Sequence, residues 1–262
     1  MISTVLILLV AVGIFLGMLL SLEIGRRLGA RRLAADTESV RHGIGALEGA
    51  VFGVFGLLIA FTFSNASSRF NDRRQYIREE VNLIGTAWLR LDLLPPEARA
   101  QERELFRRYV DSRIAAYDKL PDIVAFQAEV ARSVELQGRI WTTAVAACRE
   151  SGSQPAHVLL LPALNDMIDI VTTRTEAMKA HAPAIIFVML GIVALVASLM
   201  AGYGLAGAKS RNWAHVLGFV GVMATTVFVI VDLEFPRVGL IRLDSVDQVF
   251  VELRASMGET KK

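Results

Sequence analysis

Four stretches of the chain contain no Asp, Glu, Lys or Arg and are long enough to cross a membrane as helices. They are residues 2–22, about 49–66, 184–206 and about 214–231. The hydrocarbon core of a bilayer is spanned by about 20 apolar residues in a helix. The pattern therefore predicts four transmembrane helices in two hairpins, one within residues 1–66 and one within residues 183–234.

The segment between the hairpins, residues 67–182, shows helical rather than alternating spacing of its apolar positions. Phe70, Ile77, Val81, Ile84, Trp88 and Leu91 form a first seam, interrupted by Arg74. Prolines at 95, 96 and 121 and a turn at 151–155 divide the segment into successive helices. We therefore predict an all-α protein with a helical extramembrane domain inserted between the second and third spans, and a C-terminal tail at 235–262.

Composition excludes several classes of function. Hydrophobic residues make up 53% of the chain and the formal net charge is only +2, so neither a soluble protein nor a nucleic-acid-binding protein is indicated. The single cysteine, Cys148, is interpreted as a small buried hydrophobic residue. Glu79 and Glu80, beside three arginines, are interpreted as a salt-bridged helix face.

The search for catalytic or ligand-binding motifs is negative. Residues 202–210 superficially resemble a phosphate-binding loop, but Ala208 separates the last glycine from Lys209 and a membrane helix precedes them. We interpret these glycines as close-packing positions at a helix end. The four histidines have no metal-ligand spacing, and no nucleophile motif occurs. The sequence predicts no enzyme activity, no metal and no cofactor.

The second span carries the most informative pattern. Gly49, Gly53 and Gly56 form a stripe of small residues, while Phe55, Ile59 and Phe63 recur every four residues. Thr62, Ser64 and Asn65 follow at the end of the span, where a pore mouth would lie. Two interpretations are open. The glycines allow close helix packing and the aromatics face lipid or a neighbouring helix, or the apolar stripe surrounds a shared axis and forms a neck that gates by dewetting.

The second interpretation requires an oligomer, because one chain with four spans encloses little water. It places Leu57 on another face of the helix, where we expect packing rather than pore lining. No charged residue lies inside a span, which disfavours a secondary transporter.

Several separated blocks resemble the bacterial bestrophin-like membrane proteins. They are GLLIAFTFS at 56–64, SRF at 68–70, RR at 73–74, EVNLIGTA at 80–87, RLDLLP at 90–95 and VDLEFPRVGLIR at 231–242. The resemblance implies a homo-oligomer, with a pentamer favoured, that conducts inorganic ions. Anions are favoured and cations are the alternative. It also implies that Phe55, Ile59 and Phe63 line the neck. The tryptophan-rich segment after the bestrophin neck is replaced here by Ser68-Arg69-Phe70, and the acidic calcium clasp has no counterpart, so calcium gating is not implied.

The leading hypothesis is therefore an oligomeric ion channel in the bacterial inner membrane, in contact with lipid and with its pore lined by the second span. The alternative is a non-conducting scaffold or sensor whose helical insert binds a protein partner. Basic residues do not orient the chain. The first connector contains five arginines, and the second contains Lys209 and Arg211. A comparable number of basic residues flanks the other ends of the spans, so the charge count favours neither orientation. The resemblance places the insert and both termini in the cytoplasm.

Overall fold

The structure is a computed structural model that describes residues 4–33, 41–119, 122–207, 212–237 and 239–258. The described part of the chain contains helices and no strand, which confirms the all-α prediction. The α-helices are α1 (Thr4–Leu33), α2 (Arg41–Arg90), α3 (Pro96–Asp118), α4 (Ile123–Ser151), α5 (Leu161–Lys179), α6 (Ala184–Gly204), α7 (Trp213–Glu234) and α8 (Asp244–Ser256). Short turns of other helix types are η1 (Leu91–Leu93), η2 (Ala156–Leu160) and η3 (Leu205–Gly207).

Two compact units divide the chain, and each is built from separated segments. The first unit contains residues 1–70 and 181–241, and the second contains residues 71–180 and 242–262. Four helical stretches, which include α1, α2, α6 and α7, are long and apolar enough to cross a membrane. These stretches match the four predicted spans. The second connector, with Lys209 and Arg211, lies outside the described residues.

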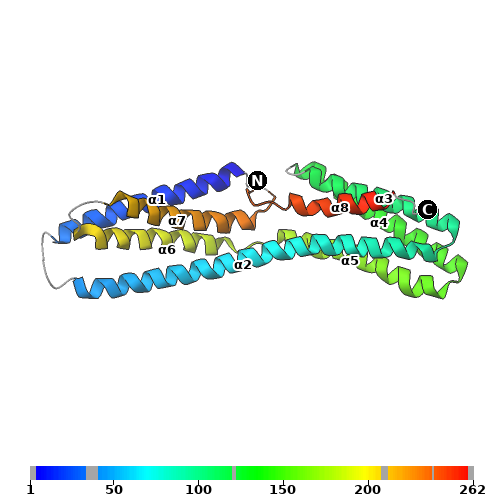
Figure 1. Ribbon diagram of the computed structural model, residues 1–262, viewed down its shortest axis with the longest axis horizontal. Helices are drawn as coiled ribbons and strands as arrows, with labels where there is room; N and C mark the ends of the chain where they lie inside the picture. The colour runs from blue at the N-terminus through cyan, green and yellow to red at the C-terminus, as the bar shows by residue number, and fades with distance from the viewer. Residues whose placement is uncertain (1–3, 34–40, 120–121, 208–211, 238, 259–262) are drawn as a thin grey trace. The chain divides into compact units, whose positions relative to one another are not determined.

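In the first unit, α1 lies along α6 and also packs on α7 (Figure 1). Glycines permit the close approach of α1 and α6. A Cβ added at Gly25 would collide with the backbone carbonyl of Leu199, and one added at Gly202 would collide with the carbonyl of Leu22. Gly202 thus serves close packing, as predicted for the glycines of this segment. The core of the unit gathers buried side chains from all four helices, among them Met18, Phe55, Leu190, Val220 and Ile230.

In the second unit, the predicted proline breaks separate the helices. Pro96 is the first residue of α3, where its fixed φ and missing N–H are tolerated. The α4 helix begins after Asp122, whose side chain accepts a hydrogen bond from the Ala125 N–H at 3.0 Å. It ends at Gly152, which has a φ of 62°. Left-handed backbone of this kind is the common conformation after a helix C-terminus, and glycine adopts it without strain.

The α8 helix lies within residues 235–262, for which the sequence predicts only a C-terminal tail. Val246 and Phe250 of α8 are buried, and the helix packs on α3. The guanidinium of Arg254 is 2.7 Å from the carboxylate of Asp111, and Arg107 donates to the carbonyl of Met257. The tail is therefore divided between the units, with residues 235–241 in the first and the remainder in the second.

Candidate pore-lining helix

The first-unit part of α2, residues 41–70, has one buried face. Phe55 is 1% exposed and Ala66 is fully buried, while Ile59 is half-buried against the same core. Phe52 meets Phe219 of α7 edge-to-face, with ring centroids 6.0 Å apart. These positions follow a spacing of three to four residues, as expected for the packed side of a helix. Phe55 therefore faces the interior of its own unit.

The opposite face of α2 is apolar and has no partner within the described part of the unit. Leu57 is 57% exposed and Phe61 is 60% exposed, one helical turn apart, with Val54 one turn earlier at 60%. Phe63, at the edge of this face, is 44% exposed. Leu57 is thus not buried within its own unit, and the packing cost expected for a buried Leu57 does not apply there. The four-residue spacing of large apolar side chains is present, but the exposed set is centred on Leu57 and Phe61.

The predicted glycine stripe lies on the exposed side. A Cβ added at Gly49, Gly53 or Gly56 would meet no atom within 4 Å among the described residues outside its own helix. This contrasts with Gly25 and Gly202, which are packed against backbone. The α2 glycines therefore do not serve helix packing inside the described chain, and they leave a smooth strip beside the exposed large side chains.

The three predicted mouth residues differ in their surroundings. Thr62 is buried, and its hydroxyl donates to the carbonyl of Leu58 at 2.7 Å, one turn earlier in the same helix. Ser64 and Asn65 are exposed. Thus only Ser64 and Asn65 continue the exposed face toward the end of the apolar segment.

A buried ionic cluster closes the first unit beyond the apolar part of α2. The guanidinium of Arg69 is 2.7 Å from the carboxylate of Glu234, which is fully buried at the end of α7. The same carboxylate accepts the Ala182 N–H at 2.8 Å and lies 3.4 Å from His181. This arrangement ties α2, α7 and the segment before α6 together.

Asp232, also buried, organises the chain just after α7. Its carboxylate accepts the backbone N–H groups of Leu240 at 2.9 Å and Ile241 at 2.7 Å. A Cβ at Gly239 would collide with this carboxylate, so the position requires glycine. Asp232 and Glu234 therefore have a structural role at the exit of the span.

In the second unit, Glu80 forms salt bridges, but its partners are arginines of other helices and not the neighbouring arginines of the predicted salt-bridged face. Glu80 is fully buried and receives two hydrogen bonds from Arg113 of α3, at 2.7 and 3.1 Å, and one from Arg174 of α5, at 2.6 Å. Arg174 stacks 4.1 Å from the Tyr117 ring centroid and reaches Asp247 of α8. The sequence contained a signal for this role, because Glu80 occupies a position of the packed seam, three residues after Ile77.

Ligand chemistry is limited in the described residues, where no group of three His, Cys, Asp or Glu side chains is arranged to hold a metal ion. Cys148 is buried, as predicted, and is a free thiol. Its backbone carbonyl lies 3.1 Å from the ring of His157.

These features are those of a polytopic α-helical membrane protein. The first unit contains four apolar helices and an ionic cluster at the end of α7, and the rest of the chain forms a helical unit. A family model for the bestrophin-like domain matches residues 12–246, and the chain therefore belongs to the bestrophin-like family. This confirms the resemblance found in the sequence blocks. No curated protein matches the chain at a significant level.

Solved structures with the same fold come from a bacterial bestrophin homologue of Klebsiella pneumoniae, crystallised as single-substitution variants. One variant has a TM-score of 0.69 at 14% sequence identity, over 93% of this chain and 97% of that chain. Two others have TM-scores of 0.67 and 0.66, also at 14% identity, over 93% of this chain and 99% of theirs. At this identity the likeness establishes the fold of the chain.

Proposed function

We propose that this protein is an oligomeric ion channel of the bacterial inner membrane, with α2 lining the pore. The observation that carries the proposal is the exposed apolar face of α2 in a chain of the bestrophin-like family. One face of α2 packs on its own unit, and the other leaves Leu57 and Phe61 uncovered. Such a helix is suited to line a space between subunits. Membership of the family makes a channel the favoured use of that space.

The neck in this proposal contains Leu57 and Phe61, with Phe63 at the edge of the exposed part, while Ile59 and Phe55 lie on the packed side of the helix. A ring of apolar side chains offers no dipole to replace the water around an ion, so a dry neck opposes conduction by several kcal/mol. Wetting of the ring lowers this barrier. Ser64 and Asn65, exposed at the end of the apolar segment, supply polar groups at the pore mouth.

The glycines at 49, 53 and 56 provide a surface for the neighbouring subunit. Small residues on a membrane helix allow the backbone of another helix to approach closely. In a ring of identical subunits, each α2 meets its neighbours through two different strips of its surface. The glycine strip of one subunit would face the larger side chains of the next, and we propose five subunits, as the family resemblance favours.

Between Glu48 and Arg69, α2 contains no charged residue, so fixed charge in the neck selects neither ion sign. The family resemblance favours anions, with cations as the alternative. Reversal potentials measured under asymmetric chloride and asymmetric sodium gradients separate the two.

The test of the channel is direct. Purified oligomer reconstituted in planar bilayers should give single-channel currents, and Leu57→Ala protein should give larger or more frequent openings because its neck is wetter. A well-folded oligomer that carries no current under varied anion and cation gradients would overturn the proposal. Recovery of one stoichiometric protein partner bound to such a silent oligomer would instead support a membrane scaffold or sensor.

A further inference from the structure

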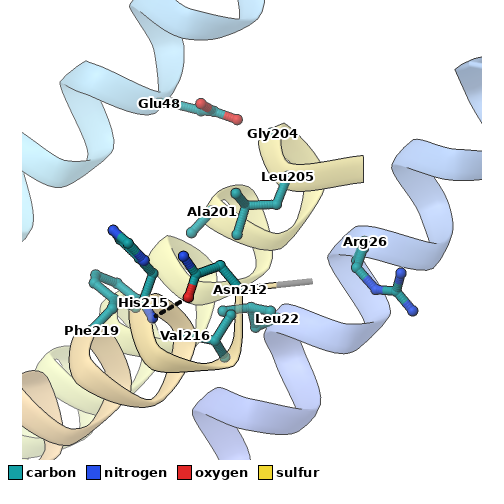
Figure 2. Close-up of a pocket in the computed structure, with 10 residues that line it drawn as sticks. All are labelled: Leu22, Arg26, Glu48, Ala201, Gly204, Leu205, Asn212, His215, Val216 and Phe219. Atoms are coloured by element: carbon teal, nitrogen blue, oxygen red, sulfur yellow. Dashed lines mark hydrogen bonds between the residues drawn. The ribbon is translucent and has the colours of Figure 1, made fainter. Parts of the chain in front are cut away.

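A cavity of about 670 Å³ opens in the first unit between the ends of α1 and α6 and the beginning of α7, with α2 on its rim (Figure 2). Its apolar lining includes Leu22, Val216 and Phe219, and its polar lining includes Glu48, Arg26 and His215. Cavities of this size and composition are typical of sites for small amphiphilic molecules. None of the residues in this cavity belongs to the exposed strip of α2 assigned to the pore.

Glu48 is the unusual member of the lining. One of its carboxylate oxygens, Oε1, is buried and has no hydrogen-bond partner in the described part of the protein. Figure 2 shows this carboxylate facing the end of α6 at Gly204. A Cβ added at Gly204 would lie 2.9 Å from Oε1, so the carboxylate rests against bare backbone. A buried anionic oxygen without a donor is costly, and a ligand that supplies the donor would be stabilised there.

The arginine of the lining is already engaged. Arg26 donates to both carboxylate oxygens of Glu23, at 3.2 and 3.3 Å, and Figure 2 shows its guanidinium directed away from Glu48. The side-chain oxygen of Asn212 accepts the backbone N–H of His215 at 3.3 Å, and neither the Asn212 amide nor the His215 ring donates to Glu48 Oε1 in the described structure. Among the described residues, the pocket thus combines an apolar wall with a carboxylate whose Oε1 lacks a donor.

We propose that this cavity binds an amphiphile with a primary amine, whose ammonium group donates to Glu48 and whose apolar part lies against Leu22, Val216 and Phe219. A divalent metal ion is a poorer fit, because calcium and magnesium take six or more oxygen ligands and the cavity offers one carboxylate. A quaternary ammonium group is also a poorer fit, since it has no N–H to donate.

The position of the cavity favours a membrane lipid as the source of the amine. Leu22 is the last residue of the uncharged part of α1, and Glu23 and Arg26 follow within a turn. Trp213, the first residue of α7, is 52% exposed, and tryptophan at a span end is characteristic of the membrane interface. An ethanolamine headgroup lies at that depth. A soluble amphiphilic amine has the same chemistry and is separated from the lipid by the experiment below.

The experiment uses the full-length protein in detergent with an equimolar mixture of phosphatidylethanolamine and phosphatidylcholine, and native mass spectrometry measures the retained lipid. The two lipids differ in the hydrogen-bond donors of the headgroup. A hydrogen bond to a charged group is worth about 1.5–3 kcal/mol, so we expect roughly tenfold preferential retention of phosphatidylethanolamine or more. Glu48→Gln should bring the ratio toward one.

Two further variants control for folding and for charge. Ala201→Phe fills the cavity while leaving Glu48 in place, and it should also lower the retention of phosphatidylethanolamine. Asp72→Asn removes an exposed carboxylate from the same helix outside the cavity and should leave the ratio unchanged. Octylamine added to protein in phosphatidylcholine tests the soluble source by a rise in the midpoint of thermal unfolding.

One outcome is that octylamine acts although phosphatidylethanolamine is not preferred. A rise in the midpoint of thermal unfolding that octylamine causes and that Glu48→Gln abolishes would then assign the site to a soluble amine. Equal retention of both lipids by the unsubstituted protein, together with no Glu48-dependent effect of octylamine, would overturn the proposal. Unchanged selectivity in both Glu48→Gln and Ala201→Phe would overturn it as well, because the preference would then come from another surface.

Discussion

Phe55 and Leu57 lie two positions apart in one uncharged segment, yet their side chains have opposite surroundings. Phe55 is 1% exposed and Leu57 is 57% exposed. Both belong to sets of apolar residues with four-residue spacing, 55-59-63 and 57-61. Where every position of a membrane helix is apolar, the spacing gives the helical period but not which face packs inside the subunit. The sequence therefore predicts an apolar stripe on α2 but does not show which of its large side chains are exposed within one subunit.

The first prediction contrasts these two residues. Phe55→Ala should lower the free energy of unfolding by about 3–5 kcal/mol, because it opens a cavity among packed side chains. Leu57→Ala should change the free energy of unfolding by about 0.5 kcal/mol or less within one subunit, since its side chain has no partner there. Thermal unfolding and single-channel recording of the same preparations give both quantities.

Phe61→Ala serves as the second exposed variant, and it should resemble Leu57→Ala in both stability and conductance. If Leu57→Ala and Phe61→Ala both reduce the yield of folded protein as strongly as Phe55→Ala, with unchanged currents from the protein that survives, the exposed strip is a packing surface and does not line the pore.

Glu102 in α3 is a second residue whose surroundings the sequence does not reveal. The residue is fully buried, and neither carboxylate oxygen has a hydrogen-bond partner in the described structure. Burial disfavours the ionised form and raises the pKa of Glu102 from 4.5 to about 8. The carboxyl group is thus mostly protonated in the folded protein at neutral pH, whereas it is ionised in the unfolded chain.

The second prediction is a pH dependence of stability. Between about pH 4.5 and pH 8 the folded state holds one more proton than the unfolded state at Glu102. Its contribution to stability therefore falls as pH rises, by up to about 1.4 kcal/mol per pH unit, and becomes constant above pH 8. Glu102→Gln should remove this contribution. Unfolding midpoints of both proteins across this range measure it, and parallel pH profiles would contradict the assignment.

At the scale of helices, glycine has two uses that the sequence pattern does not distinguish. Gly202 is in contact with the backbone of α1, whereas Gly53 has open space beside it within the described chain.

The third prediction contrasts these two glycines. Gly202→Ala should destabilise the first unit by about 1–3 kcal/mol, since overpacking forces the two helices apart. Gly53→Leu should leave the fold of the subunit intact and weaken its assembly.

The measurement for the glycine variants combines thermal unfolding with the molar mass of the detergent-solubilised particle by light scattering. Gly53→Ala is the mild control, because alanine favours a helix more than glycine by about 1 kcal/mol. An unaltered oligomer in Gly53→Leu would show that the glycine strip does not face a neighbouring subunit.

The fourth prediction concerns the ionic cluster that joins α2, α3 and α5 in the second unit. Glu80→Gln leaves Arg113 and Arg174 buried without their carboxylate, and breaking a buried pair in this way costs about 3–5 kcal/mol. Glu79→Gln, at the adjacent exposed position, should change stability by about 0.5 kcal/mol or less. Similar losses in the two variants, measured by thermal unfolding, would contradict a special role for Glu80.

Helix ends were easier to predict than helix partners. Pro96 sets a boundary through local backbone chemistry, and α3 begins there. The α4 helix begins at Ile123, and the predicted break at Pro121 lies outside the described residues. The partners of Glu80 are 33 and 94 residues away, and no local rule gives them. The α8 helix had a usable signal in the four-residue spacing of Val246 and Phe250, but its 13 residues are short enough to be mistaken for a tail.

At the scale of the whole chain, both units are assembled from segments far apart in sequence. The first combines residues 1–70 with 181–241, and the second combines 71–180 with 242–262. The chain therefore passes between the units three times, inside α2, after α5 and before α8. The second unit thus contains the end of the chain as well as its middle, and α8 is part of its packing.

The fifth prediction is the orientation of the chain in the membrane. The second unit includes both the middle of the chain and its end, so fusions at Lys262 and within residues 151–154 must report the same side. The charge tally is nearly even, and the family resemblance places that side in the cytoplasm. Cytoplasmic reporter activity is expected at both positions, and a fusion within the first connector, at residue 37, should report the periplasm. Periplasmic signals at both Lys262 and 151–154 would reverse the orientation, whereas opposite signals at these two positions would contradict four membrane crossings.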